Sequence, residues 1–190
     1  GMDGKVEGQV KLSLPLVNSV DAADIKVDGK MRITEGRARQ LVGPYDVQGA
    51  SITLDFAERS ADAKGEMLVA GIPTRLAWQK TFEQDASPPA QLKLTARLDN
   101  SDRSQLGLDV NHILQGEIPV EVTVTPSPRG EPQVMVHADL TNADLALDNI
   151  AWRKPPGAHA DLQFEIMSLA ESLGIETFDD DQLLANLRSF

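Results

Sequence analysis

Alternation of apolar and polar residues dominates this chain. Between Val10 and Leu16 every second residue is apolar, and similar runs recur over 25–33, 50–56, 66–70, 74–80, 92–98, 118–124, 136–140, 145–147 and 160–166. Side chains on a strand point alternately to opposite faces, so each run has one apolar face and one polar face. The spacing of three and four residues that an amphipathic helix needs is missing, so the pattern predicts about ten strands.

Glycine and proline divide these runs. Gly29 interrupts a long run and predicts a bulge or a tight hairpin. Glu35-Gly36-Arg37 reads as a turn, and Gly43-Pro44 leaves the stretch 41–47 ambiguous. Pro155-Pro156-Gly157 predicts a rigid turn between two of the last strands, because proline fixes φ and glycine adopts conformations that a side chain forbids.

Two segments break the alternation and favour helix. A short helix is expected within 100–114, with Asn100 or Ser101 as its N-cap and Gly107 near its end. In 167–190 leucines recur at helical spacing, and Asp179-Asp180-Asp181 would lie at a helix N-terminus, where negative charge is favourable. We therefore expect a C-terminal amphipathic segment packed on the strands.

These elements predict a mainly β fold. Strands with a single apolar face belong to antiparallel sheets, because parallel strands are buried on both faces and need helical crossovers. The expected organisation is one elongated antiparallel β domain over 1–166, followed by the helical segment 167–190. Two arrangements stay open: a closed β-sandwich, in which two apolar faces cover each other, and an open, curled sheet with an apolar groove. The residues alone favour the sandwich.

Composition narrows the functional classes. The formal net charge of −11 disfavours a nucleic-acid partner, because phosphates would repel the chain. The chain has no cysteine, which excludes disulfides and thiolate metal sites. No apolar run reaches the roughly 20 residues that span a bilayer. Aromatic residues make up only 4%, which leaves few platforms for stacking on bases or sugars.

No catalytic motif stands out. His137 and His159 fall at polar positions of their strands and would come together if those strands pair, but a third metal ligand with suitable spacing is lacking. Two carboxylate pairs, Asp99 with Asp102 and Asp144 with Asp148, are expected by chance among 29 acidic residues. Nucleophile elbows and phosphate-binding glycine loops are absent from the sequence. We expect a protein that is not an enzyme and that uses no metal or cofactor.

A resemblance to a known family covers most of 10–166. The run Ala138-Asp139-Leu140-Thr141-Asn142-Ala143-Asp144-Leu145, then Trp152-Arg153-Lys154-Pro155-Pro156-Gly157, then Ala160 and Leu162, resembles the AsmA-like family of Gram-negative envelope proteins, especially its YhdP-type branch. Further similar segments are Gly71-Ile72-Pro73 before Leu76-Ala77-Trp78, and Ala96-Arg97-Leu98-Asp99 before Arg103. The sequence departs from the family pattern after Ile166, where the family continues with more strands.

The resemblance implies a periplasmic segment of an inner-membrane-anchored protein, with the anchor outside this chain. Such proteins are built of repeated β segments whose apolar groove conducts phospholipid between the inner and outer membranes. The resemblance favours the groove over the sandwich, with neighbouring β segments of the same protein as partners. The runner-up is a structural or protein-interaction module without lipid cargo. The residues expected to line the apolar face are Leu12, Leu14, Ile52, Leu54, Phe56, Leu94, Val120, Val122, Leu145, Leu162 and Phe164.

Overall fold

The computed structural model describes residues 2–13, 26–42, 44–82, 90–127 and 132–166. The predictions for Leu14 and for the segment 167–190 lie outside these residues. The elements are β1 (Met2–Ser13), β2 (Lys26–Val42), β3 (Tyr45–Ala57), β4 (Ser60–Val69), β5 (Ile72–Thr81), β6 (Ala90–Leu98), α1 (Asn100–Gln105), β7 (Leu114–Gln115), β8 (Ile118–Thr125), β9 (Gln133–Asp139), β10 (Asp144–Leu147), a 3-10 turn (Asp148–Ile150), β11 (Trp152–Lys154) and β12 (Asp161–Ile166).

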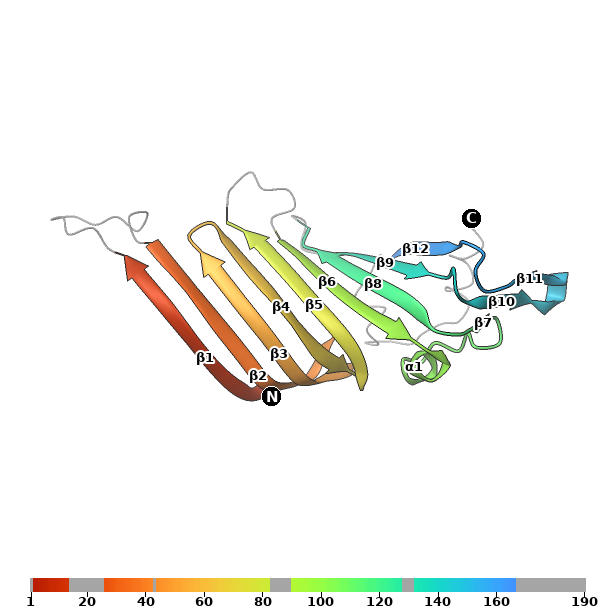
Figure 1. The fold of residues 1–190 in the computed structure, drawn as a ribbon, viewed down its shortest axis with the longest axis horizontal. Coiled ribbons are helices and arrows are strands. Elements are labelled where there is room, and N and C mark those ends of the chain that lie inside the picture. The colour runs from red at the N-terminus through yellow and green to blue at the C-terminus, as the bar shows by residue number, and fades with distance from the viewer. Residues whose placement is uncertain (1, 14–25, 43, 83–89, 128–131, 167–190) are drawn as a thin grey trace.

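Nine of the strands form one open antiparallel sheet in the order β1-β2-β3-β4-β5-β6-β8-β9-β12. As Figure 1 shows, the strands lie side by side from β1 at one edge to β12 at the other. The mainly β, antiparallel class predicted from the alternation is confirmed. The closed sandwich is not what the described residues form, because all nine long strands belong to a single continuous sheet.

A small second sheet, in the order β11-β10-β7, stands beside the end of the large one (Figure 1). The stretch around 137–166 was expected to hold three strands, but Trp152–Lys154 adds a fourth that pairs with β10. The turn predicted at Pro155-Pro156-Gly157 is confirmed: Gly157 has a positive φ of 91° and donates its N–H to the carbonyl of Thr141 at 2.8 Å.

The predictions for two glycine-containing turns were wrong. Gly29 lies in regular pairing with Val10 on one side and Phe56 on the other, with no bulge. A Cβ on Gly29 would come within 2.3 Å of the Phe56 ring, so the glycine makes room for an aromatic ring across the sheet. Glu35-Gly36-Arg37 is not a turn between two strands. Glu35 takes a left-handed φ of 55°, and β2 continues past it through a shift in register.

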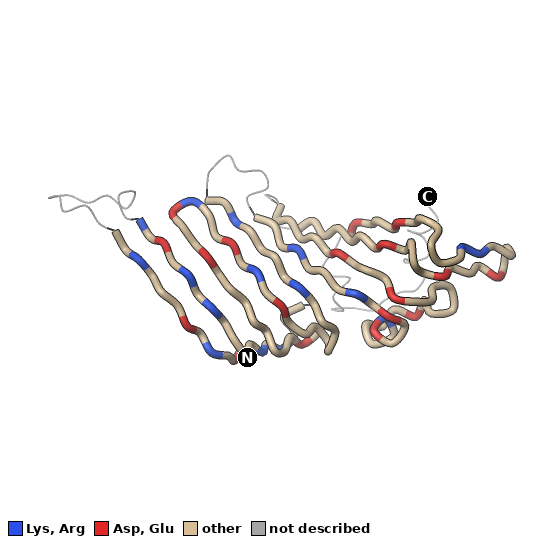
Figure 2. Tube along the Cα trace, viewed as in Figure 1, with Lys and Arg blue, Asp and Glu red and all other residues tan. Residues whose placement is uncertain are grey.

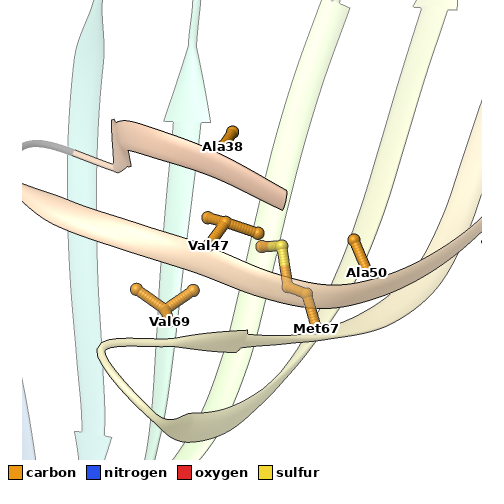
Figure 3. Packing of buried hydrophobic residues seen from close by; sticks show 5 residues of the cluster. All are labelled: Ala38, Val47, Ala50, Met67 and Val69. Carbon is orange, nitrogen blue, oxygen red and sulfur yellow. The ribbon is translucent and has the colours of Figure 1, made fainter. Parts of the chain in front are cut away.

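These irregularities bend the sheet. Register shifts between β2 and β3 follow Ile33, Gly36 and Ala38, and a further shift between β3 and β4 follows Gln48. Bulges of this kind increase local twist and bend the strand. In Figure 3 the bent ends of β2 and β3 bring together the small buried cluster of Ala38, Val47, Ala50, Met67 and Val69.

The predicted short helix is present, and its N-cap lies one residue earlier than predicted. Asp99, not Asn100 or Ser101, is the N-cap: its side chain accepts from the N–H of Asp102, and the Asp102 side chain accepts from the N–H of Asp99. This reciprocal capping box satisfies two donors that a helix start leaves free. Gly107, with a φ of 76°, follows the C-cap Leu106 as predicted.

Candidate functional site

The register of the large sheet aligns apolar residues across all nine strands. Residues directly opposite each other in antiparallel strands share a face. One row therefore runs without interruption from β1 to β12 and consists of Val6, Ile33, Ile52, Gly65, Leu76, Leu94, Val122, Val136 and Phe164. A parallel row consists of Gly8, Met31, Leu54, Ala63, Trp78, Leu92, Val124, Val134 and Ile166. We call the side of the sheet that carries both rows the apolar face.

Two buried clusters cover the apolar face toward one end of the strands. The cluster of Ala38, Val47, Ala50, Met67 and Val69 packs with Ile52, Leu76 and Leu94 of the first row. The cluster of Ile72, Leu98, Ile118, Ala138 and Ala143 packs with Leu106 and Leu114, from the segment around α1 and the small sheet. The start of β3 reaches the same region, because the Tyr45 hydroxyl donates to the carbonyl of Leu106 at 2.7 Å. This burial also raises the pKa of Tyr45.

Away from that end, most side chains of the two rows are only partly buried. In the first row, Ile33, Ile52, Leu76, Leu94 and Val122 all have intermediate exposure. Toward the edges exposure rises: 65% for Val6 and 59% for Val10 on β1, and 42% for Phe164 on β12. Val134 and Val136 on β9 are buried. The face is thus apolar, continuous and incompletely covered.

Most of the residues expected from the sequence lie on this face. The two rows contain Ile52, Leu54, Leu94, Val122 and Phe164, and the same strand phase places there Leu12, Phe56, Val120 and Leu162. Leu145 does not belong with them. It lies on β10 of the small sheet, between Leu114 and Lys154, because the chain leaves the large sheet after β9.

The opposite face of the sheet is polar. Four ion pairs lie along it, namely Lys30–Asp55, Arg75–Glu66, Lys93–Glu121 and Arg97–Glu117. Figure 2 marks the charged positions along the strands. The pairs are largely exposed, and such pairs stabilise a fold by about 1 kcal/mol or less. A shallow depression between Thr53, Lys64 and Lys93 lies on this polar side.

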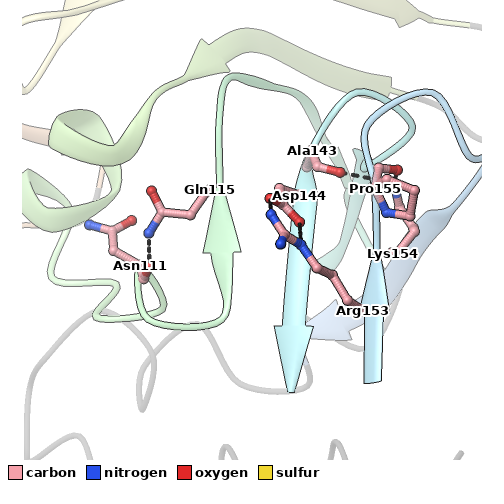
Figure 4. A network of polar contacts seen from close by, with 7 residues as sticks. All are labelled: Asn111, Gln115, Ala143, Asp144, Arg153, Lys154 and Pro155. Atoms are coloured by element: carbon pink, nitrogen blue, oxygen red, sulfur yellow. Dashed lines mark hydrogen bonds and ion pairs between the residues drawn. The ribbon is translucent and has the colours of Figure 1, made fainter. Parts of the chain in front are cut away.

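Two buried cations donate hydrogen bonds to the connecting segments near α1 and the small sheet. Arg103 on α1 is 1% exposed, and its guanidinium donates to the carbonyls of Leu98, Leu114 and Gly116 and to the side chains of Asn100 and Asn111. Lys154 is 7% exposed and donates to the carbonyl of Thr141. It also donates to the carbonyls of Ala143 and Pro155, which Figure 4 shows beside it. The Lys154 ammonium is therefore directed to backbone carbonyls and not to solvent.

Sequence reasoning missed the structural role of both cations. A lone Arg after a helix start and a Lys before Pro-Pro usually read as exposed side chains. The only local signal was Asp99-x-x-Asp102, a capping pattern that fixes the helix on which Arg103 lies.

The two carboxylate pairs noted in the sequence have other partners in the structure. Asp99 and Asp102 cap α1. Asp144 pairs with Arg153 rather than with Asp148, through two hydrogen bonds, one of 2.9 Å between Nε and Oδ1 (Figure 4). Arg153 holds the pKa of Asp144 below its ordinary value of 3.8, and the same contact raises the pKa of Arg153. A glycosidase acid needs the opposite shift.

The two histidines do come together, as the strand pairing predicted. His137 Nε2 lies 3.2 Å from Asp161 Oδ1, and His159 Nε2 lies 2.9 Å from Asp161 Oδ2. The hydroxyl and N–H of Thr141, and then the nearby histidines, lower the pKa of Asp139. Within the described part of the chain, no group of three or more acidic or histidine side chains is arranged to bind a metal ion.

Comparison with known proteins does not place the chain in a family. No protein-family model, no curated protein and no solved structure matches it. Among the residues that the structure describes, no helix has the length and hydropathy needed to span a membrane.

Proposed function

We propose that the apolar face binds the acyl chains of a lipid and that the protein acts without catalysis. One observation carries the proposal: the apolar row from Val6 to Phe164 crosses nine strands, yet its side chains stay partly exposed over most of that length. Monomeric soluble proteins rarely expose an apolar surface of this extent unless something binds there.

The energetics favour an acyl chain as the ligand. Each methylene removed from water contributes about 0.8 kcal/mol, so a chain lying along the face could replace the missing second layer of the sheet. The face offers Leu, Ile, Val and Met side chains and no charged group along either row, and the charges lie on the opposite face. Recognition would be by shape and hydrophobicity rather than by hydrogen bonding.

The resemblance to AsmA-like envelope proteins supports a more specific proposal. In it, the chain is a periplasmic segment of an inner-membrane-anchored protein, and its apolar face continues into neighbouring β segments of the same protein. Phospholipid would then pass along a continuous surface between the inner and outer membranes. The alternative, a structural or protein-interaction module, uses the same face for a protein partner.

Native mass spectrometry of the purified protein tests the proposal. We expect phospholipid to co-purify and to exchange with added phospholipid vesicles. The Val122→Asp variant places a charge in the middle of the row and should abolish lipid retention. Because Val122 is only partly buried, the variant should stay folded, as judged by circular dichroism.

Thr123→Asp is the matched control. It adds the same charge on the neighbouring residue, whose side chain lies on the polar face opposite Lys93. It should retain lipid at the level of the unmodified protein. A folded protein that carries no lipid and takes none from vesicles would refute lipid binding and favour the protein-interaction module.

A further inference from the structure

The outer edge of β1 is an unusual feature of the large sheet. β1 is 12 residues long, lies at the sheet edge and contains no proline. Its apolar side chains are strongly exposed, 65% for Val6, 59% for Val10 and 58% for Leu12. A long edge strand presents a row of backbone donors and acceptors, and proteins ordinarily blunt such edges with charged side chains, proline, bulges or short length. In β1 the register shift lies near the start, after Asp3, and the charges of Glu7 and Lys11 have opposite signs. No strand in the described part of the chain pairs with this edge.

The sequence of β1 is complementary to itself. Its regular part, after the register shift that follows Asp3, is Lys5–Ser13, with Gln9 at its centre. When two such segments pair antiparallel over their full length, Gln9 lies opposite Gln9 of the second copy. That register places Glu7 opposite Lys11, Val6 opposite Leu12, Val10 opposite Gly8 and Lys5 opposite Ser13. Both copies of the Glu7–Lys11 pair form at once, because the arrangement is two-fold symmetric.

Neighbouring registers lack this complementarity. Centring the pairing on Gly8 places Lys5 opposite Lys11, and centring it on Val10 places Lys11 opposite Gln9. Like charges directly opposite each other destabilise a strand pair. A shift by a single residue would turn the apolar side chains of one copy to the polar face of the other.

We propose that two copies of this chain associate through their β1 strands, antiparallel and centred on Gln9. The two sheets then form one continuous sheet, and the apolar faces of both copies lie on the same side of it. This pairing packs Val6 of each copy beside Leu12 of the other and gives hydrogen-bond partners to backbone groups along the outer edge of β1. It does not depend on whether the apolar face binds lipid.

Charge reversal tests the pairing and its register together. Sedimentation equilibrium should show a dimer for the unmodified protein. Glu7→Lys places Lys opposite Lys11 in both symmetric pairs, and should weaken dimerisation about tenfold or more. The double variant Glu7→Lys/Lys11→Glu restores opposite charges and should recover the dimer. Circular dichroism checks that each variant is folded, which is expected because both side chains are exposed.

A cysteine crosslink tests the symmetry axis directly, since the chain has no cysteine of its own. Gln9→Cys would place two thiols opposite each other, with Cβ atoms about 5 Å apart, close enough for oxidation to link them. Lys11→Cys is the control, because its two thiols would be offset by four residues, about 13 Å along the strand. A monomer at all concentrations, or larger open assemblies in which Gln9→Cys does not crosslink, would overturn the proposal.

Discussion

At the scale of single residues, two buried cations order the irregular end of the molecule. Arg103 donates to the carbonyl of Leu98 at the end of β6 and to two carbonyls in the connection to β8, and Lys154 donates to two carbonyls between β9 and β10. Leaving a buried carbonyl without a donor is costly. In these connections, a cation with several donors therefore supplies hydrogen bonds to the backbone carbonyls, as neighbouring strands do in the sheet.

Arg103→Met should destabilise the fold strongly. It keeps much of the side-chain volume but leaves five acceptors without their donor, three of them carbonyl oxygens. We expect a loss of about 2–5 kcal/mol in the free energy of unfolding, measured by urea denaturation. Arg97→Met is the control, since it breaks only the exposed pair with Glu117 and should cost about 1 kcal/mol or less. Equal losses in the two variants would contradict the role of Arg103.

The Asp144–Arg153 pair should make stability depend on acid pH. Because Arg153 lowers the pKa of Asp144 in the folded protein, the pair stabilises the fold above the ordinary pKa of 3.8. That stabilisation is lost as the pH falls through the lower, folded-state pKa. Denaturation curves of the unmodified protein and Arg153→Met should therefore differ at pH 7, approach each other as the pH falls below 3.8, and converge below the folded-state pKa of Asp144. Arg37→Met, which removes the same charge at an exposed position of β2, should show no such convergence.

At the scale of elements, close approach between strands fixes some positions as glycine. Gly65 lies in the apolar row between Ile52 and Leu76. A Cβ there would lie 2.2 Å from the carbonyl oxygen of Ser51 and 2.8 Å from the Cα of Ile52. These are backbone atoms, so relief would require β3 and β4 to move apart.

Gly65→Ala should accordingly destabilise the protein by about 1–3 kcal/mol, although alanine is only one methyl group larger. Thermal unfolding followed by circular dichroism measures the loss. Gly8→Ala on the edge strand is the comparison, because its added Cβ would meet its nearest atoms only at 3.0 Å. A tolerated Gly65→Ala would mean that β3 and β4 approach less closely than described.

Loss of the capping box at the start of α1 should lower the stability of the protein and also loosen the contacts of Arg103, although the helix is short. Asp99→Ala removes the acceptor for the N–H of Asp102, and should cost about 0.5–2 kcal/mol. Because α1 carries Arg103, the same variant should loosen the carbonyl contacts around it. Hydrogen exchange of the Leu114 and Gly116 region measures this effect. Ser101→Ala, at an exposed position of the same helix turn, is expected to change neither quantity.

At the scale of the whole molecule, the large sheet is mostly a meander. Each strand from β1 to β6 pairs with its neighbour in sequence, and only the steps β6 to β8 and β9 to β12 skip over other elements. The molecule has no second sheet of comparable size among its described residues, so its protection from solvent should vary across the sheet.

The rate of backbone amide hydrogen exchange should depend on the position of each strand in the sheet. Interior strands such as β5, bonded on both sides, should exchange slowest, and β12 at the edge should exchange fastest. Mass spectrometry of exchange at peptide resolution measures the gradient. Uniform protection of β12 and β5 would show that another element or partner covers the edge at β12.

Alternation in the sequence determined much of this fold. The phase of Ile52, Leu54, Leu94, Val122 and Phe164 was enough to assign them to one face, because strand geometry links the period of two to the side of the sheet. The antiparallel class followed from the same pattern, since a one-faced strand does not suit a parallel sheet. The proposed lipid ligand rests on this face, on its partial exposure in the folded sheet and on a family resemblance.

Tertiary structure decided what local pattern could not. Leu145 has the right alternation but lies in a different sheet, because pairing partners are set by where the chain can reach after Asp139. Gly29 was predicted to mark a bulge or a hairpin, but it makes room for the Phe56 ring across the sheet. Glu35-Gly36-Arg37 was predicted as a turn, but β2 continues there through a shift in register. The burial of Arg103 and Lys154 depends on carbonyls from distant segments. Such long-range contacts leave no periodic trace in the sequence, so only the folded arrangement reveals them.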